Sequence, residues 1–272
     1  MNNISERIIS VNSNEEKCRL LDYIGDDYLK VPYLYLDLEK YGIGTENVKT
    51  WYSVNKNNEI NCIFLLYFDC LHIYSRNYSK EILDLIINEI KKNQPHTIIT
   101  VDEIGKELSS IEKEYNSIKS YVITTKNISI KGIGYKIEMA DYEDIDKIVD
   151  LFFESEHYRL LYSKDLLRKQ LEQRFNDKFG RIFIIRNGEK IDATMSIYGE
   201  NEKIAITSGL VASSKSIRPG LSVSLIKGIE NILRDENKIN LGFISNEDEN
   251  LLKFNLKIGA EIVATYYKLL KN

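Results

Sequence analysis

The sequence predicts an α/β protein made of two related domains. Strand patterns with a period of two residues alternate with helical patterns of about 3.6 residues, and one order of strand, turn and helix occurs in both halves. Matching elements begin 141, 142 and 144 residues apart, at the pairs Ser79 and Gly220, Thr97 and Ile239, and Glu103 and Glu247. This nearly constant offset favours duplication of one fold over a chance match between two common element orders.

Composition argues against several functional classes. The chain has 272 residues, of which 43% are hydrophobic and 29% are charged, so it is long enough for two ordinary cores. A net charge of -4 argues against a protein that coats nucleic acid, because that task needs an excess of lysine and arginine. Cys18, Cys62 and Cys70 lack the spacing of metal ligands, so we expect no metal site.

No segment has the pattern of a membrane anchor. The longest apolar run, Cys62–Phe68, has seven residues, whereas a membrane-spanning helix needs about 20. The first residues, Met1–Arg7, lack the apolar region of a signal peptide. We therefore expect a cytoplasmic protein with reduced cysteines, no membrane partner, and a monomeric or homodimeric state.

The domain boundary is predicted from glycine usage. The segment Lys126–Gly134 contains two glycines and no helical period, which indicates a linker, and we expect domains at 1–130 and 131–272. Four of the 14 glycines precede the boundary and ten follow it. Because glycine permits tight turns and close approach of a ligand, the second domain has the better candidates for ligand-binding loops.

The first domain is predicted to contain four strands and two helices. The strands are expected at Trp51–Val54, Glu59–Phe68, Leu71–Tyr74 and Thr97–Val101. The helices are expected at Ser79–Lys92 and Glu103–Tyr115, because apolar residues recur there every three or four positions.

The second domain is predicted to begin with two helices and a hairpin. Helical periods run through Asp141–Phe153 and Ser163–Phe175. Two strands, Arg181–Arg186 and Ile191–Ile197, flank an Asn187-Gly188 pair, and Asn-Gly favours a type I′ hairpin turn.

The rest of this domain alternates strands and helices. The expected elements are a strand at Lys203–Val211, a helix from Leu221, a strand at Ile239–Ile244, a helix at Glu247–Ile258 and a strand at Glu261–Leu269. Gly259 is the expected stop of the last helix.

The turn before Leu221 is the strongest candidate for a binding site. Leu221, Leu225, Ile229 and Leu233 share one helical face, so the helix begins directly after Gly220. The first backbone N–H groups of a helix are unpaired and lie at the positive end of the helix dipole, which suits a phosphate or pyrophosphate. Gly220 allows close approach, and Arg218 adds a charged donor.

These landmarks resemble the GCN5-related N-acetyltransferase (GNAT) superfamily. Its acetyl-CoA signature is a strand followed by Arg/Gln-x-x-Gly-x-Gly/Ala at the start of a helix, and Gly220 and Ser222 match the last two positions. Ile217 stands where the family has Arg or Gln, so Arg218 is displaced by one. Ser245-Asn246 after the next strand and Gly259 after the next helix also match, although Ala260 replaces the family's Phe.

The resemblance implies a fold and a cofactor. It implies two GNAT-like domains, each a mixed, mainly antiparallel sheet flanked by helices, and an acyl-CoA-dependent N-acyltransferase, with acetyl-CoA the expected donor. The implied acceptor is a primary amine of a small molecule or peptide. By this resemblance the cofactor-binding residues are Leu210, Val211, Arg218, Pro219, Gly220, Leu221, Ser222, Val223 and Asn246.

The resemblance implies less about the proton-transfer groups. Relatives use a Tyr on the helix after the Asn as general acid, and Asn255 occupies that site here. Tyr266 is our candidate acid and Glu202 our candidate base, with Tyr198, Tyr267, Glu200, Glu154, Glu156 and His157 as further possibilities. The first domain has no glycine at Tyr74–Ser79, the equivalent turn, so we expect a degenerate copy there.

Two other functional classes stay open. A protein that kept the fold but lost the acid and base would be a non-catalytic acyl-CoA-binding or interaction module. A nucleotide- or phosphate-binding protein would use the same helix start. Competition between ATP and CoA for the protein distinguishes a nucleotide- or phosphate-binding protein from an acyl-CoA-binding one, because only a pantetheine groove favours CoA.

Overall fold

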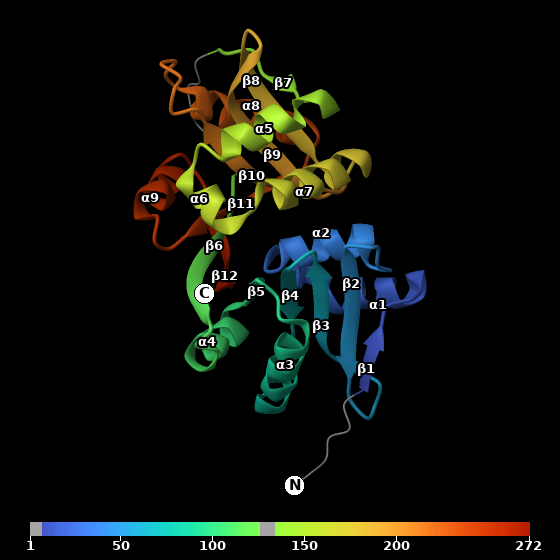
Figure 1. Cartoon of the computed structure of the whole chain (residues 1–272). Helices are drawn as coiled ribbons and strands as arrows, with labels where there is room; N and C mark the ends of the chain where they lie inside the picture. The colour runs from blue at the N-terminus through green and yellow to red at the C-terminus, as the bar shows by residue number, and fades with distance from the viewer. Residues whose placement is uncertain (1–6, 126–133) are drawn as a thin grey trace. The chain divides into compact units, whose positions relative to one another are not determined.

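The computed structural model describes residues 7–125 and 134–272, and the chain forms two compact units (Figure 1). The first unit contains the chain up to Val122 together with Ile244–Leu252 and Ile262–Asn272. The second unit contains Ile123–Phe243 and Lys253–Glu261. The expected boundary at residues 130 and 131 lies outside the described residues, and the expected division at that point stays a prediction.

The sheet of the first unit has the strand order β1-β2-β3-β4-β5-β12-β6. The β4–β5 pair is parallel, while β1–β2, β2–β3, β3–β4 and β5–β12 are antiparallel. The strands are β1 (Arg7–Ser10), β2 (Val48–Val54), β3 (Ile60–Tyr67), β4 (Cys70–Tyr74), β5 (Thr97–Val101), β6 (Tyr115–Thr124) and β12 (Glu261–Lys271).

The described residues in the N-terminal part of this unit contain four helices, and the sequence predicted two of them. They are α1 (Asn14–Ile24), α2 (Pro32–Tyr41), α3 (Lys80–Asn93) and α4 (Asp102–Ile111), with a 3₁₀ turn at Gly25–Leu29. The side chain of Ser13 caps α1 by accepting from Glu16 N–H, and Pro32 opens α2. The elements β1, β6, α1 and α2 were not predicted from the sequence.

The predicted helix Glu103–Tyr115 is wrong at its C-terminal end. The helix α4 ends at Ile111, and Tyr115 is the first residue of β6. The Tyr115 hydroxyl donates to the Pro95 carbonyl at 2.7 Å, so this buried ring is anchored beside β5 instead of on the helix. The apolar spacing that placed Tyr115 on a helical face was coincidental.

The C-terminal strand β12 completes the sheet of the first unit. Tyr266 pairs with Val101 and Leu269 with Ile98 on β5, and both β12 residues are buried. Gly105 of α4 allows close packing, since a Cβ on it would lie 2.3 Å from Tyr267 Cβ. Residues from the far end of the chain therefore form part of the first unit's core.

The sheet of the second unit has the order β11-β10-β9-β8-β7. The β10–β11 pair is parallel, and β7–β8, β8–β9 and β9–β10 are antiparallel, so each unit has the mixed, mainly antiparallel sheet that was expected. The strands are β7 (Glu138–Met139), β8 (Arg181–Asn187), β9 (Lys190–Glu200), β10 (Ile204–Ala212) and β11 (Ile239–Ser245).

The predicted β8–β9 hairpin is confirmed, but its turn differs. Asn187 pairs with Lys190, so Gly188 and Glu189 are the central residues of the turn. Only the first of them, Gly188, has a positive φ, at 60°. This is the pattern of a type II′ turn and not of the expected type I′ turn.

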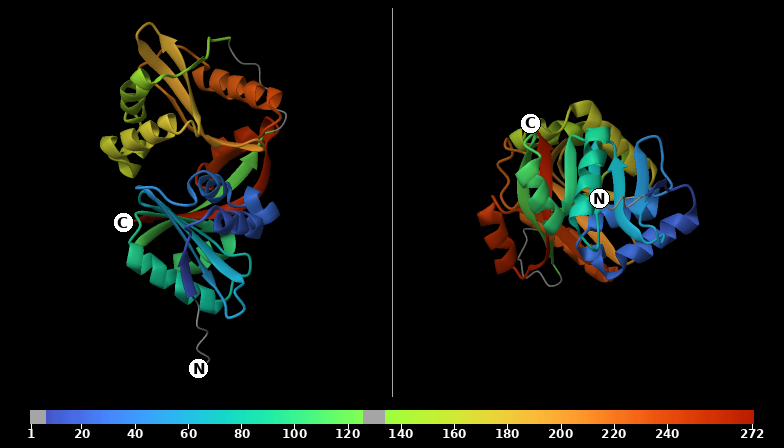
Figure 2. Two further views of the ribbon diagram at one scale, coloured as in Figure 1. Left: turned by 90° about the vertical axis from the view of Figure 1, so that its right-hand side faces the viewer. Right: turned by 90° about the horizontal axis from the view of Figure 1, so that it is seen from below.

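Helices cover both faces of the second unit's sheet, as Figure 2 shows in its left view. Strand residues alternate: Ile182 and Ile184 face the cluster with α5 and α7, while Phe183 and Ile185 face α8. The helices are α5 (Ile145–Phe152, after a 3₁₀ turn at Tyr142–Asp144), α6 (Glu156–Leu161), α7 (Lys164–Asn176) and α8 (Leu221–Asp235). The residues of a further helix, α9 (Glu249–Lys257), are divided between the two units.

Candidate functional site

A β-bulge interrupts β10 next to the predicted site. Ser208 pairs with Ser196 and Val211 with Thr194, so two β10 residues, Gly209 and Leu210, oppose one residue of β9. Gly209 has a φ of +66°. A bulge bends the strand and re-aims its backbone groups, and bulges are common beside functional sites.

Gly209 is required for a second reason. A Cβ at this position would lie 2.9 Å from Cζ of Phe152, a buried residue at the end of α5. The glycine therefore lets the bulged backbone lie directly against the Phe152 ring. A glycine inside a strand pattern is the sequence signal that could have revealed this bulge.

The strand β10 leaves its neighbour at the same place. Its register with β11 covers Ile204 to Ile206, while β10 itself continues to Ala212. The Thr207 hydroxyl donates to Asn240 Oδ1 at 2.9 Å, at the point where the register ends. Among the described residues, the register of β10 with β11 does not extend to Leu210 and Val211. An unpaired strand edge of this kind can pair with an extended ligand.

The turn after β10 leads into an uncapped helix. Gly220 is the N-cap residue of α8, with φ 71° and ψ 17°, and no side chain caps the helix. The first-turn N–H groups of Leu221, Ser222 and Val223 have no partner within the helix, and the first turn carries no acidic residue. Because α8 has 15 residues, the positive end of a full helix dipole lies at this turn.

The equivalent helix of the first unit begins differently. The Ser79 side chain caps α3 by accepting from Ile82 N–H at 3.4 Å, and Glu81 occupies the first turn. Hydrogen bonds from its own N–H and from Ser79 lower the pKa of the Glu81 carboxyl. The start of α3 is thus satisfied by its own side chains, whereas the start of α8 is open.

Arg218 does not extend toward open solvent. Its Nη1 donates to Asp192 Oδ2 at 3.2 Å and to the Arg186 carbonyl at 2.9 Å. The guanidinium also lies over the Tyr135 ring, 4.3 Å from its centre. The structure therefore shows Arg218 as an anchor of the turn, and its expected contact with a phosphate stays a prediction.

A second carboxylate also holds this turn. Glu154, just after α5, accepts from Ser213 Oγ at 2.8 Å, Ser214 N–H at 3.2 Å and Lys215 Nζ at 2.8 Å. The Lys215 ammonium holds the pKa of the Glu154 carboxyl below its usual value. Because three donors of the turn already contact the Glu154 carboxylate, this residue is a poor candidate for the proton acceptor.

A cavity of about 520 Å³ lies beside the turn. The β8–β9 hairpin, α5 and the segment from Ser213 to Arg218 form its walls. Ile217 lines it with a side chain that is 98% exposed. The charged lining residues are Lys147, Asp150, Glu154, Glu189, Lys190, Asp192, Lys215 and Arg218.

The candidate base Glu202 lies at the other end of β10. It is an exposed residue of the turn before the strand, eight residues before Leu210. At about 3.3 Å per strand residue, this separates its backbone from the bulge by roughly 25 Å. The structure does not bring Glu202 to the turn at Gly220, and its role as a base stays a prediction.

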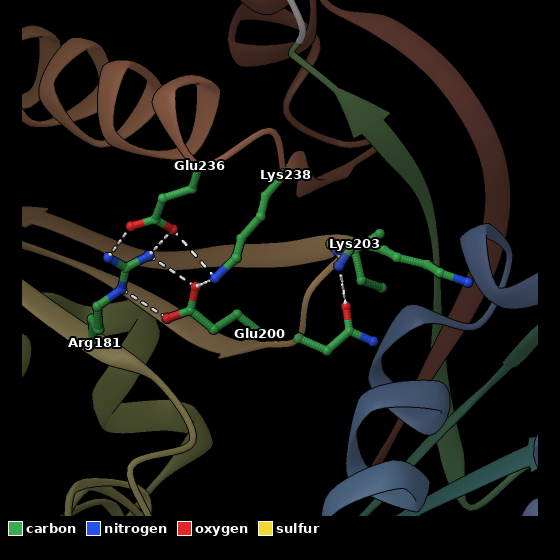
Figure 3. Close-up of polar contacts among 7 residues, drawn as sticks. Arg181, Glu200, Lys203, Glu236 and Lys238 are labelled. Carbon is green, nitrogen blue, oxygen red and sulfur yellow. Dashed lines mark hydrogen bonds and ion pairs between the residues drawn. The ribbon is translucent and has the colours of Figure 1, made fainter.

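The neighbouring Glu200 belongs to an ion-pair network at that far end (Figure 3). It lies 2.7 Å from Arg181 Nε and 2.5 Å from Lys238 Nζ, and Glu236 joins the same two cations. Hydrogen bonding from Arg181 lowers the pKa of Glu236. These contacts give Glu200 a structural role in joining β8, β9 and the end of α8.

The candidate acid Tyr266 lies in the first unit. It is 8% exposed on β12, and burial raises the pKa of its hydroxyl. Asn246 also belongs to the first unit, where its N–H donates to the Lys119 carbonyl at 3.0 Å. Tyr266 and Asn246 thus belong to a different unit from the turn at Gly220, and their roles stay predictions.

The remaining candidates have local partners or lie in α6. The Arg174 guanidinium lies 3.2 Å from the centre of the Tyr198 ring, and Tyr267 packs against Gly105. Glu156 and His157 are the first residues of α6. None of these contacts joins a candidate to β10 beside the bulge.

Comparison with solved structures identifies the fold. No family model and no curated protein matches the sequence. A tandem GNAT protein from the clavulanic acid biosynthesis pathway is 9% identical, with a TM-score of 0.62 over 97% of this chain and 98% of that protein. A GCN5-related N-acetyltransferase-like protein from Streptococcus suis is 14% identical, with a TM-score of 0.62 over 96% and 100%. The chain has the GNAT fold.

Further neighbours agree with this fold. A GNAT-family acetyltransferase from Colwellia psychrerythraea is 10% identical, with a TM-score of 0.57 over 98% of this chain and 100% of that protein. Because the chain covers nearly the full length of the tandem GNAT protein, the expected fold class with GNAT-like domains is confirmed. In the described ranges, no helix combines the length and apolar character needed to cross a membrane.

Proposed function

We propose that this protein is an acyl-CoA-dependent N-acyltransferase, with acetyl-CoA as the donor. The observation that carries the proposal is that three structural features follow one another along the chain in the second unit. A bulged strand leaves its neighbour, a turn ends in Gly220 at positive φ, and an uncapped helix of 15 residues follows. Together they fit an extended pantetheine followed by a pyrophosphate.

Different residues of this region would bind different parts of the cofactor. The free edge of β10 at Leu210 and Val211 would pair with the amides of the pantetheine arm. The N–H groups of Leu221, Ser222 and Val223 would hold the pyrophosphate, and Gly220 leaves room for its oxygens. Pro219, Arg218 and Asn246 complete the proposed set.

The proposed reaction is direct transfer to an amine. The neutral amine nitrogen forms a bond to the thioester carbonyl carbon, and the carbon–sulfur bond breaks. One proton leaves the nitrogen for a base, and the CoA thiolate takes up a proton from an acid. Glu202 and Tyr266 remain the predicted base and acid. The acidic net charge favours a cationic acceptor such as a polyamine or a basic peptide.

One observation favours a non-catalytic acyl-CoA-binding module as the second candidate. The polar side chains of β10 are those of Thr207 and Ser208, so this strand has no carboxylate beside the bulge. A protein with the cofactor site but no proton acceptor would bind acyl-CoA without turnover.

Calorimetry and a thiol-release assay test the proposal together. The protein should bind acetyl-CoA more tightly than ATP, and it should release free CoA in the presence of a suitable amine from a broad panel. Binding without release over the whole panel would favour the second candidate. Failure to bind acetyl-CoA would contradict both.

A further inference from the structure

The segment between β10 and α8 needs support from outside itself. Its own contacts are short-range: Ser216 N–H donates to the Ser213 carbonyl, Lys215 N–H to Ser213 Oγ, and Arg218 N–H to Ser216 Oγ. We name Ser213–Arg218 the cofactor loop. Such local bonds shape a turn but do not fix its position on the protein.

Glu154 fastens the first half of the cofactor loop to the end of α5. Its carboxylate accepts hydrogen bonds from three consecutive loop residues, one through a hydroxyl, one through a backbone N–H and one through an ammonium group. The Glu154 side chain is 21% exposed and that of Lys215 80%. The Glu154 carboxylate is therefore mostly shielded from solvent, whereas the Lys215 side chain that pairs with it is mostly exposed.

Asp192 fastens the second half of the cofactor loop to β9. Its Oδ2 accepts from Ser216 Oγ at 2.9 Å and from Arg218 Nη1 at 3.2 Å, and its backbone carbonyl accepts from Ser213 N–H at 2.7 Å. The residue is 6% exposed in a strand whose neighbours Ile191 and Ala193 are buried. A buried aspartate needs such partners, and all three of these come from the loop.

The charges of this arrangement are balanced pair by pair. Glu154 meets Lys215, and Asp192 meets Arg218, so neither carboxylate is left to repel a phosphate. The N–H groups at the start of α8 are not capped by a side chain, so they keep their partial positive charge at this turn. The pairs therefore fix the loop without adding net charge next to the anion site.

We propose that Glu154 and Asp192 are positioning residues that hold the cofactor loop ready for acyl-CoA. They touch the loop and not the cofactor, and they reduce the ordering that binding would otherwise require. This inference rests on the proposed function for its ligand. In the free protein, the same contacts should hold the loop in place before any ligand binds.

Limited proteolysis tests whether the cofactor loop is held in place in the free protein. Lys215 is the only site within the loop that trypsin can cut readily, because Pro219 follows Arg218. Cleavage after Lys215 should be slow in the wild type, faster in Glu154→Gln and fastest in Glu154→Ala, because glutamine keeps the oxygen acceptor and loses only the charge. Asp192→Asn should also accelerate cleavage.

Glu189→Gln is the matched control. Glu189 lines the same cavity but is fully exposed, and its ion pair at 3.8 Å is with Lys147, outside the loop. This variant should be cut at the wild-type rate. Circular dichroism and the urea midpoint identify any variant that fails to fold, and Glu154→Gln, the mildest change, then decides the comparison.

Calorimetry with acetyl-CoA tests the link to the ligand. Glu154→Gln should raise the Kd about tenfold, and in any acylation assay it should raise KM while leaving kcat unchanged. Equal cleavage and equal affinity in Glu154→Gln, Glu154→Ala and wild type would overturn the inference. Wild-type protein that binds no acetyl-CoA would overturn the proposed function instead, while the cleavage rates would still decide whether the carboxylates hold the loop.

Discussion

At the scale of single residues, two glycines make the second unit's site. Gly209 has a positive φ and lies against Phe152, and Gly220 has a positive φ and starts α8. Both positions would strain an L-amino acid, and Gly209 has no room for a Cβ. The site therefore depends on backbone geometry at two points more than on any polar side chain.

A comparison of Gly209→Ala with Gly188→Ala separates strain from crowding. Both glycines have a positive φ, but a Cβ at Gly188 meets nothing within 4 Å, whereas at Gly209 it lies 2.9 Å from Phe152 Cζ. Both variants should lose about 1 kcal/mol through backbone strain. Gly209→Ala should lose about 1–3 kcal/mol more through overpacking, as measured by urea unfolding. Equal losses would contradict the close packing.

At the scale of elements, a buried polar cluster joins α8 to the sheet. Glu230 of α8 is 9% exposed and accepts hydrogen bonds from Thr125 Oγ1 and Asn240 Nδ2. Asn240 of β11 in turn accepts from Thr207 of β10, where the two strands separate. The helix that carries the open N-terminus is thus tied to the strand that would hold the pantetheine.

The cluster predicts a pH dependence of stability. Burial raises the pKa of Glu230 above its ordinary value of 4.5, so the folded protein binds this proton more tightly than the unfolded chain does. The contribution to stability is present below pH 4.5 and declines as pH rises through the folded pKa. Urea unfolding between pH 4 and 8 should show that Glu230→Gln lacks this decline. Parallel pH curves for the two proteins would count against it.

At the scale of the whole molecule, the last strand belongs to the first unit. Tyr266 and Leu269 of β12 are buried beside β5, and the strand lies between β5 and β6 in the sheet order. A fragment that ends at the expected boundary of residue 130 therefore lacks an interior strand of its own sheet. The first unit is therefore complete only when residues 262–272 have joined its N-terminal part.

Deletion of residues 262–272 tests this completion. Without β12, the strand β5 loses its antiparallel partner, so those N–H groups of residues 98–101 that face β12 should lose protection in hydrogen exchange, whereas those that face β4 should keep it. The β8–β9 hairpin of the second unit provides the internal control and should keep its protection. Unchanged protection of β5 in the deletion variant would show that β12 is dispensable there.

The sequence predicted local structure better than long-range pairing. Most strands and helices from Trp51 onward, and the open start of α8, were recognisable because glycine positions and apolar periods are local signals. The place of β12 was not, because a period of two residues marks a strand but does not name its partner. Tyr115 was misplaced for the same reason: its spacing fitted a helix that ends four residues earlier.

In the candidate site, too, the contacts between residues far apart in the chain could not be predicted from the sequence. The sequence indicated Arg218 as a donor near the turn, but only the structure shows that Asp192, a single acid in an apolar strand, takes its guanidinium. A lone charge in a buried strand is a signal that could have been read. The acid and base could not be found by spacing, since Tyr266 and Glu202 lie in different units and Glu202 lies at the opposite end of β10 from the bulge.

In the proposed function, the open start of α8 binds the phosphates of acyl-CoA. One measurement tests it most directly: calorimetric titration of acetyl-CoA into Gly220→Asp, with Ser79→Asp as the matched control at the equivalent start of α3. Aspartate is among the non-glycine residues that adopt a positive φ most readily, and it is a good N-cap at the extended Ser79 position, so both helices should form. Gly220→Asp should weaken binding at least about tenfold, because its carboxylate lies beside the free N–H groups and repels phosphate. Ser79→Asp should bind like the wild type, and equal affinity in all three proteins would contradict the account.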